Sequence, residues 1–544
     1  MALETSYFQL PPTLADEIEK FATTVEQFRD GGLTPEEFRV PRAGFGIYQQ
    51  RPPDTFMLRV RCTGGGILPR HLRTIAALAT EYGADELHVT TRQEFQIHDL
   101  RLTALIDVLR QLYAAGLATR GGCGNAIRNI VASWDAGVAV DEAFDVTPYA
   151  VALMNRLAQE ADSWQLPRKF KFAFVGQTRD LAEAQCTDVG FVACHRDGTP
   201  GFAVYVAGGM GRGSQTGHLL HDFIPATQVY AVANAVKRVF YHHGNRTDRN
   251  KARLRFLWNE LGRERFVALY EEELQRLAGA QLAPADIPAP AVWPHQQPSG
   301  HATGADFTRW RERYVTPQKQ AGLYTVLLPI ARGLLTTTVA QALCDMLPDD
   351  NADVLRCTPQ QNLAVRHVPD ADLERLYAFA YEHFPLARHP RFFGNCISCT
   401  GARICALGLC HSRDALMSVE QALLASDIDL DACRDVSLGI SGCPNACGRH
   451  LMADLGCAGK LLRRGEQTTP AYAIFTGASF TAAAARLGSR VADVTAADLP
   501  ALISDTLRGY VRERATYPTF GAYAAARGDD EIRARCAAYQ ATTT

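Results

Sequence analysis

One pattern of hydrophobic and polar positions occurs twice along the chain. The first copy, Phe56–Tyr82, reads as an alternating strand, a glycine turn and an amphipathic helix, and a second strand follows at Val89–Ile97. The other half repeats the pattern at Leu323–Leu347 and Val354–Val365. Each copy closes with a further helical stretch, at 102–115 and 371–383. The pattern predicts two β-α-β-α units with helices on one face of a sheet.

The spacing within the two copies favours duplication of an ancestral unit. Gly66 precedes Thr91 by 25 residues, and Gly333 precedes Thr358 by 25. A Pro- and Ala-rich stretch at 281–304 separates the halves and reads as an exposed, semi-rigid connector. We therefore expect an α+β chain with pseudo-two-fold duplication, divided into a first unit, a first larger lobe, a linker, a second unit and a second lobe, at 1–118, 119–280, 281–304, 305–388 and 389–544.

Composition narrows the class of protein. Of the 544 residues, 47% are hydrophobic and 21% are charged, and the net charge is −2. This balance is typical of a globular protein and offers no basic excess for nucleic acid. We find no uninterrupted apolar run of about 18 residues and no signal-peptide pattern at the N-terminus, so we expect a cytoplasmic protein without a membrane span.

Seven of the 15 cysteines fall between residues 396 and 447. Cys399 and Cys405 form a C-x5-C motif, and Cys443 and Cys447 form a C-x3-C motif, both in turns rich in Gly and Pro. Four thiolates delivered from such turns suit an iron–sulfur cluster. A zinc site that uses Cys396 with Cys399, Cys443 and Cys447 is an alternative, and buried thiols in unrelated loops are another. The cysteines alone leave these alternatives open.

The first half also contains cations in short polar motifs on apolar strands. Arg59 and Arg61 alternate in FMLRVR, and Lys169 and Lys171 alternate in LPRKFKF, so each pair shares a face. Other cations lie in TTRQEFQ, GCGNAIRN and the basic stretch 246–255. Because an unpaired buried cation is costly, the set indicates a buried polyanion.

The motifs SCTGARIC and SGCPNACGRH resemble the cluster signature of the sirohaem-dependent sulfite and nitrite reductases. The resemblance implies two ferredoxin-like β-α-β-α units, each followed by a larger α+β lobe for sirohaem or cluster. It also implies that Cys399, Cys405, Cys443 and Cys447 bind a [4Fe–4S] cluster and that Cys447 bridges to the sirohaem iron. Cys396 and Cys410 are additions to the family pattern.

The resemblance implies a role for each of the cations of the first half. Its substrate-binding positions match Arg59, Arg128, Lys169 and Lys171. Its sirohaem contacts match Arg92, Gln96, Arg246 and neighbouring basic residues, with Thr91, Asn125, Gly208 and Gly209 lining the same pocket. Some family members join a tyrosine to a cysteine five residues before the substrate arginine, which here suggests Tyr48 and Cys123. An ordinary tyrosine and a free thiol are the alternative.

The resemblance implies six-electron reduction of sulfite to sulfide. Lys171 favours sulfite, since plant-type nitrite reductases of the family usually have Asn at this place. Nitrite reduction to ammonia on the same site is the first alternative, and a non-catalytic scaffold stabilised by zinc is the second. No flavin or nicotinamide fingerprint stands out. The electrons are therefore expected from a separate ferredoxin or flavoprotein.

Overall fold

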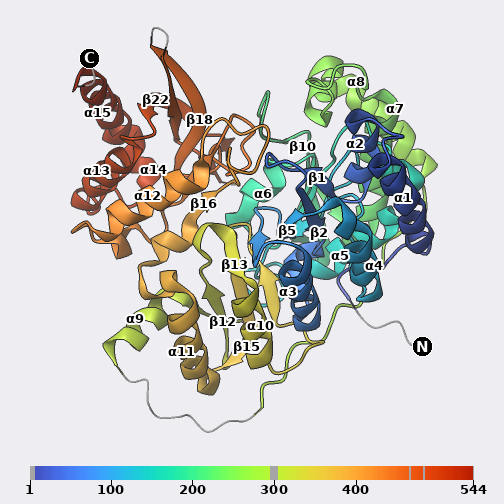
Figure 1. The fold of residues 1–544 in the computed structure, drawn as a ribbon, viewed down its shortest axis with the longest axis horizontal. Helices are drawn as coiled ribbons and strands as arrows, with labels where there is room; N and C mark the ends of the chain where they lie inside the picture. The colour runs from blue at the N-terminus through green and yellow to red at the C-terminus, as the bar shows by residue number, and fades with distance from the viewer. Residues whose placement is uncertain (1–5, 295–303, 465–466, 482–483, 543–544) are drawn as a thin grey trace.

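A computed structural model describes residues 6–294, 304–464, 467–481 and 484–542. Part of the predicted linker, residues 295–303, lies outside the described residues. The two smaller units form the lower centre of Figure 1, with the first lobe above them on the right and the second lobe above them on the left. The fold is mixed α+β, as the sequence predicted.

The two predicted units exchange strands with each other. The first sheet has the order β1-β2-β5-β4-β13, and the second has the order β11-β12-β15-β14-β3. Strand β13 therefore leaves the second half to pair with β4, and β3 leaves the first half to pair with β14. The bounds in the first sheet are β1 Ile47–Gln49, β2 Phe56–Val60, β4 Glu86–Val89, β5 Phe95–Leu100 and β13 Leu334–Thr336. Those in the second are β3 Gly66–Ile67, β11 Val315–Pro317, β12 Leu323–Leu328, β14 Leu355–Cys357 and β15 Leu363–Pro369.

Amphipathic helices cover these two sheets. They are α3 Pro69–Tyr82 and α4 Leu105–Ala114 in the first unit, and α10 Thr337–Met346 and α11 Leu373–His383 in the second. Helices α3 and α10 pack on each other across the pseudo-symmetry axis. Strand exchange and helix packing together join the two units into one body with a common hydrophobic core.

The duplication is real, but its register lies one position earlier in the first half than the sequence suggested. Thr90 N donates to Glu94 O and Thr358 N donates to Asn362 O, each at 2.9 Å. The glutamine preceding each of these acceptors has a positive φ, 56° at Gln93 and 65° at Gln361. Thr358 therefore matches Thr90 rather than Thr91. A one-residue offset is invisible to hydrophobic alternation when both faces of the strands are buried.

The two lobes repeat one sheet topology. The orders are β10-β9-β8-β7-β6 in the first lobe and β16-β17-β18-β19-β22 in the second. In each sheet three strands run parallel and two antiparallel strands follow. The bounds in the first lobe are β6 Val131–Ala132, β7 Phe172–Val175, β8 Val189–Arg196, β9 Thr199–Val206 and β10 His218–Pro225. Those in the second are β16 Cys396–Ser398, β17 Leu438–Ser441, β18 Leu455–Arg464, β19 Gln467–Thr476 and β22 Ser489–Thr495.

Each lobe has its own helices. The principal ones are α5 Thr147–Ala158, α7 Val229–His243 and α8 Leu254–Arg276 in the first lobe, and α12 Ser412–Leu424, α13 Leu499–Arg512 and α15 Asp529–Thr542 in the second. Two N-terminal helices, α1 Leu14–Arg29 and α2 Pro35–Gly44, flank the first unit. The second lobe has a separate hydrophobic core.

The connector differs from the exposed spacer expected from its composition. Leu282, Ala291 and Trp293 are buried, and Asp353 N donates to Ala289 O at 2.7 Å. These buried apolar side chains therefore attach the connector to the body of the protein, while Val292 and several other residues of the stretch stay exposed. Within the described ranges, none of the helices is long and apolar enough to cross a bilayer.

Candidate anion site facing a cysteine cluster

Two neighbouring parallel strands of the second lobe deliver the cysteine motifs. Cys399 directly follows β16, and Cys443 follows β17 by two residues. Because parallel strands place their carboxyl ends at the same edge of the sheet, the two motifs meet there. Gly442 N donates to Cys399 Sγ at 3.1 Å. Backbone N–H groups that donate to cysteine sulfur also occur at iron–sulfur sites, where they stabilise the thiolates.

Cys443 lies within electrostatic range of the other three motif cysteines. Burial raises the pKa of Cys443 to about 11, and the charges of Cys447, Cys399 and Cys405 add to the rise. Mutually repelling thiolates become stable when a cationic iron centre neutralises them. In the described part of the chain, no three His, Cys, Asp or Glu side chains surround a position for one metal ion.

The two additional cysteines point away from the motifs. Cys396 Sγ lies 3.4 Å from Phe392 O, and Cys410 Sγ lies 3.3 Å from Lys460 O. Both side chains belong to the hydrophobic core of the second lobe. The zinc set considered above needs Cys396, so the observed direction of this thiol disfavours it.

Lys169 and Lys171 share one face of the segment that leads into β7. Phe170 and Phe172 alternate with them and are completely buried. The strand period of two therefore turns both lysines to the opposite face, as the sequence predicted. Arg128 joins this segment, because its backbone N donates to Phe170 O at 2.8 Å. The lysines are half-buried and Arg128 is buried.

Cations outnumber carboxylates in this region. Its cationic side chains are Arg59, Arg92, Arg128, Lys169, Lys171 and Arg253, and its carboxylates are Glu94 and Asp188. Arg59 donates to Glu94 at 2.9 Å, and Arg253 donates to Asp188 at 2.9 Å. The remaining cations have no carboxylate partner among the ion pairs of the described residues.

This excess changes the acidity of the cations. Burial, followed by the charge of Arg253, lowers the pKa of Lys169 to about 7. Burial and the charge of Arg92 lower the pKa of Lys171 well below its ordinary value, and burial lowers that of Arg92 to about 9. The buried Nε atoms of Arg92, Arg128 and Arg253 have no hydrogen-bond partner. These buried donors without a partner fit an anionic ligand, and so do the pKa values that burial depresses at Lys169, Lys171 and Arg92.

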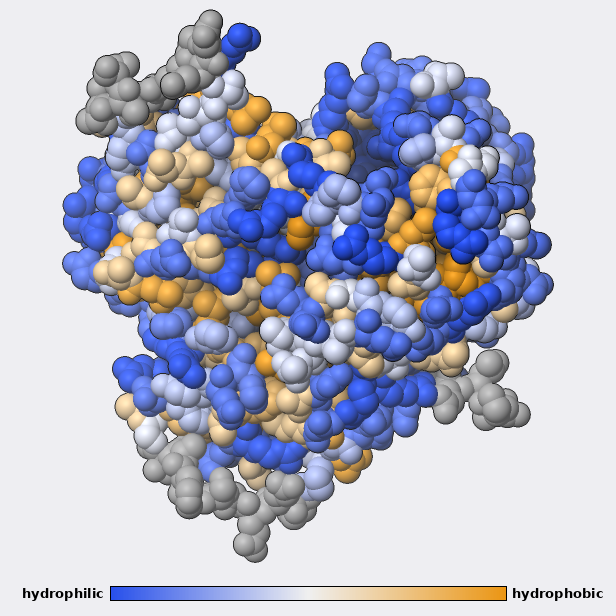
Figure 2. Space-filling view, viewed as in Figure 1, coloured by the Kyte–Doolittle hydropathy of each residue, from blue (hydrophilic) through white to orange (hydrophobic). Residues whose placement is uncertain are grey.

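The cysteine turn faces these cations. Thr91 Oγ1 donates to Cys447 O at 3.2 Å, and a Cys447 thiolate raises the pKa of Lys169 against the effect of burial. Cys447 itself is exposed. Figure 2 shows the surface indented between the second lobe and the part of the molecule that carries α2 and α8. The C-terminal cysteine motif and the cations of the first half therefore meet between the lobes.

Three other predicted residues have different surroundings. Gln96 is buried in the first sheet, where its amide contacts His88 and Arg59. Arg246 is exposed and donates to Gln165 O at 3.0 Å and Tyr241 O at 2.9 Å. Asn125 is also exposed. The structure does not bring the side chains of Arg246 and Asn125 into contact with the cation group.

Gly208 and Gly209 form a tight turn beside further basic residues. Gly209 has a φ of 153°, and a Cβ there would lie 2.8 Å from Arg255 Nη1. Arg255 is buried, and burial lowers its pKa to about 10. Asp188 was missed from the sequence, since a single acid before an apolar strand gives no signal. Arg253 and Arg255 lie among the basic neighbours of Arg246 that the sequence predicts as contacts, although Arg246 is the one residue of the stretch that it predicts by number.

Tyr48 and Cys123 lie close together. Cys123 is fully buried, whereas 40% of Tyr48 is exposed. Burial raises the pKa of the Cys123 thiol, and a hydrogen bond with Tyr48 acts in the opposite direction. The same thiol feels the charges of Arg59 and Arg128. The pair therefore borders the cation group, in the place where the sequence suggested a link.

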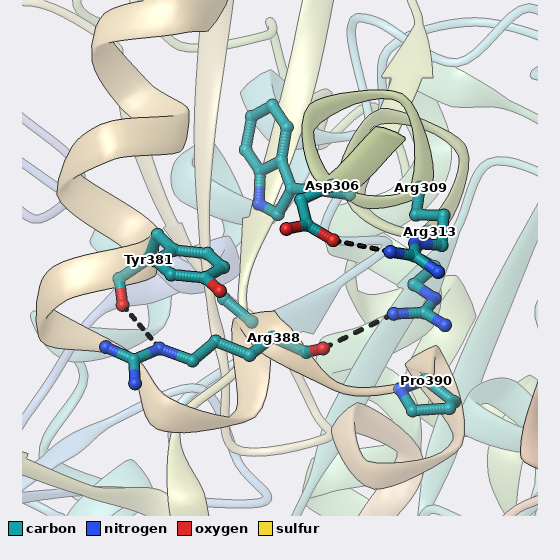
Figure 3. A pocket seen from close by; sticks show the side chains of 8 residues that line it. Asp306, Arg309, Arg313, Tyr381, Arg388 and Pro390 are labelled. Atoms are coloured by element: carbon teal, nitrogen blue, oxygen red, sulfur yellow. Dashed lines mark hydrogen bonds and ion pairs between the residues drawn. The ribbon is translucent and has the colours of Figure 1, made fainter. Parts of the chain in front are cut away.

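The structure also contains a cavity that lies apart from the cation group and the cysteine motifs. It measures about 250 Å³ and lies where α9 Ala305–Tyr314 meets residues 381–390 (Figure 3). Its charged side chains already have partners: Arg309 pairs with Asp306, Arg313 pairs with Asp431, and Arg388 donates to Tyr381 O at 2.8 Å. It shares no lining residue with the cation group or the cysteine motifs.

Two family models match the chain. The nitrite and sulphite reductase 4Fe-4S domain matches residues 123–277, which form the first lobe. The nitrite/sulfite reductase ferredoxin-like half domain matches residues 48–115 and again residues 316–382, one match in each unit. The four motif cysteines lie outside the first match, in the second lobe, which repeats the same sheet topology.

Individual proteins resemble the chain over most of its length. It is 31% identical to the ferredoxin–nitrite reductase of Synechococcus elongatus, with 94% of each chain covered. It is 28% identical to a sulfite reductase [ferredoxin] of Mycobacterium tuberculosis, over 88% of this chain and 83% of that protein. Among solved structures, the Mycobacterium tuberculosis NirA protein matches with a TM-score of 0.80 and 26% identity, over 96% of this chain and 98% of that one.

Proposed function

The chain belongs to the family of nitrite and sulphite reductases, and we propose that within this family it reduces sulfite to sulfide by six electrons. The observation that supports this reaction is the group of cations facing Cys447, in which Arg92, Arg128, Lys169 and Lys171 have no carboxylate partner among the ion pairs of the described residues. A site that must hold a small oxyanion needs uncompensated positive charge at that place. The electron donor we propose is a ferredoxin, the donor in the names of several relatives.

The residues fit the two prosthetic groups that this reaction needs. Cys399, Cys405, Cys443 and Cys447 would hold a [4Fe–4S] cluster, with the N–H of Gly442 directed at the first sulfur. The unpaired donors of Arg92, Arg253 and Arg255 would hold the carboxylates of sirohaem. When bound, the two groups supply electron storage and an iron on which a small anion can be reduced.

The chain's own residues supply charge and protons. Arg59 and Arg128 can bind an oxyanion by charge-assisted hydrogen bonds. Lys169 can release a proton near neutral pH, because burial and the charge of Arg253 lower its pKa to about 7, and burial with the charge of Arg92 lowers the pKa of Lys171 well below its ordinary value. Loss of one such donor from a closed site typically costs about 2.7–4 kcal/mol of barrier.

Lys171 is our reason for placing sulfite before nitrite. Sulfite is a pyramidal dianion with three oxygens, so it can use one more cation than nitrite, which has one charge and two oxygens. Reduction of nitrite to ammonia on the same residues is the second candidate, favoured by the identity to the Synechococcus elongatus nitrite reductase. The two reactions would share Arg59, Arg128 and Lys169 and would differ in their use of Lys171.

The test is the turnover of sulfite and nitrite side by side with a chemical reductant. We expect faster sulfite turnover by the natural protein, and Lys171→Asn should lower sulfite turnover about tenfold more than nitrite turnover. Lys171→Arg, which keeps the charge, is the matched control. An equal loss on both anions would remove the reason for preferring sulfite.

A further inference from the structure

A line of buried hydrogen bonds begins at Arg59 and runs across the first sheet. With its amide oxygen turned to Arg59, Gln96 accepts from Nη2 at 2.6 Å and from Nε at 3.2 Å. The amide nitrogen of Gln96 then donates to His88 Nδ1 at 2.8 Å. His88 lies on β4 and is only 5% exposed. The guanidinium group is therefore held, through Gln96, by a buried imidazole.

The line continues from His88 into the second half of the chain. Gln361 Nε2 lies 2.9 Å from His88 Nε2 and 3.2 Å from Val89 O, to which it donates. Gln361 Oε1 accepts from Ser398 N at 3.1 Å. Ser398 is the last residue of β16, and the next residue is the proposed cluster ligand Cys399. The line thus connects the cluster strand with Arg59.

The two ends of this line both present an N–H donor to the imidazole of His88. Arg59 fixes Gln96 so that its N–H points at the ring, and Ser398 fixes Gln361 so that its N–H also points at the ring. Burial lowers the pKa of His88 well below its ordinary value, so the ring is neutral. A neutral imidazole has one lone pair and one N–H, so it can accept from only one of the two glutamines.

We propose that His88 is a positioning residue that holds Arg59 in place through Gln96, and that Gln361 competes with Gln96 for it. When the ring accepts from Gln96, Arg59 is held against an oxyanion. When it accepts from Gln361, the amide nitrogen of Gln96 keeps only its weaker contact with His98 Nε2, at 3.2 Å, and the amide that accepts from Arg59 is less firmly held. The direction of Arg59 then depends on the strand that carries Cys399. This inference rests on the proposed function, because it takes Arg59 as an anion-binding residue.

The duplicated fold provides a matched control. Gln93 occupies the position in the first unit that Gln361 occupies in the second. Gln93 Nε2 donates to Ala132 O and to Cys357 O, each at 3.0 Å, and Gln93 Oε1 accepts from Ala132 N at 3.0 Å. Gln93 therefore ties one lobe to the opposite unit as Gln361 does, but it makes no hydrogen bond with His88.

The experiment substitutes His88 in the holoenzyme so that the contributions of the two ring nitrogens to sulfite binding can be measured separately. The side-chain oxygen of Asn can replace Nδ1, and that of Gln can replace Nε2. Sulfite binding is followed by its change in the visible spectrum without reductant, and KM and kcat are measured with a chemical reductant. We expect His88→Gln to weaken sulfite binding and raise KM on the order of fivefold with little change in kcat. His88→Asn should remain within about twofold of the natural protein.

A second variant predicts the opposite sign. Gln361→Met removes the competing N–H, so His88 is always free to accept from Gln96, and sulfite should bind on the order of threefold more tightly. Gln93→Met should reduce thermal stability and leave sulfite affinity unchanged. Equal affinity in His88→Asn and His88→Gln, or weaker binding in Gln361→Met, would overturn the proposal. A natural protein that binds sulfite but does not reduce it would contradict the proposed function instead.

Discussion

At the scale of single residues, the site depends on positive charge that the protein leaves without partners. Glu94 and Asp188 each neutralise one arginine. Lys169, Lys171 and Arg92 remain, with pKa values lowered by burial. Such an arrangement costs stability unless a ligand supplies negative charge, so we attribute it to anion binding rather than to folding.

Lys169 predicts a pH dependence. Its pKa is lowered to about 7, so it is protonated below that pH and loses its positive charge as the pH rises through it. The value of kcat/KM for the anion, which reports the free enzyme, should therefore fall as the pH rises through about 7. In Lys169→Arg the fall should move to higher pH, because arginine keeps its proton. A profile unchanged by this substitution would exclude Lys169 as the titrating group.

Tyr48 and Cys123 predict a change in mass. If the two side chains are joined by a thioether, the intact holoenzyme should be lighter than its sequence by two hydrogen atoms. Cys123→Ala should restore the sequence mass, and Cys186→Ala, which removes another buried cysteine, should leave the deficit in place. An intact mass equal to that of the sequence would establish a free thiol beside an ordinary tyrosine.

Sequence reasoning found those site residues whose neighbours fix their direction. Lys169 and Lys171 alternate with core phenylalanines, so their common face follows from the strand period. It could not separate Arg246 from Arg253, because which part of the basic stretch packs against the first lobe depends on tertiary contacts. It also missed His88 and Gln361, since a buried polar pair across the two halves leaves no pattern in either half.

At the scale of elements, the carboxyl ends of β16 and β17 place the two cysteine motifs. Their parallel pairing brings two motifs, more than forty residues apart in sequence, to one sheet edge. The same sheet turns Cys396 and Cys410 into the core. This geometry supports the C-x5-C interpretation, which stays a prediction, over the zinc alternative that spacing alone had left open.

Substitution of single cysteines tests this division between ligands and core residues. Cys405→Ser should abolish the acid-labile sulfide of the purified protein, because one corner of the cube loses its thiolate. Cys396→Ser and Cys410→Ser should retain it, with a loss of stability of about 1–3 kcal/mol from a buried hydroxyl. Sulfide and iron analysis, together with thermal unfolding, measures both effects. Full cluster content in Cys405→Ser would contradict the assignment.

The element order was predictable, but the pairing between elements was not. The repeated strand, turn and helix gave both units. The exchange of β3 and β13 could not be foreseen, because these strands have two and three residues and too few positions for a periodic signal. The one-residue shift of register was also unpredictable, but for a different reason. Strands buried on both faces have no polar side, so the hydrophobic pattern does not fix which residue faces which way.

At the scale of the whole molecule, duplication has divided the chemistry between two similar halves. The first unit and first lobe hold the cations, and the second lobe holds the cysteine motifs. The exchanged strands and the core shared by the two units fix the halves against each other. Contacts such as Thr91 to Cys447 and Arg51 to Gly408, at 3.2 and 2.9 Å, then join the first unit directly to the second lobe.

Everything proposed here requires that the cysteine motifs bind a [4Fe–4S] cluster beside a sirohaem on which the anion is reduced. The most direct measurement is iron, acid-labile sulfide and the visible spectrum of protein purified from cells that make both groups, followed by turnover of sulfite and nitrite. We predict the irons and sulfides of one [4Fe–4S] cluster, one additional iron in a tetrapyrrole with visible absorption bands, and reduction of sulfite to sulfide. Colourless protein without iron and labile sulfide, unable to reduce either anion, would contradict the account.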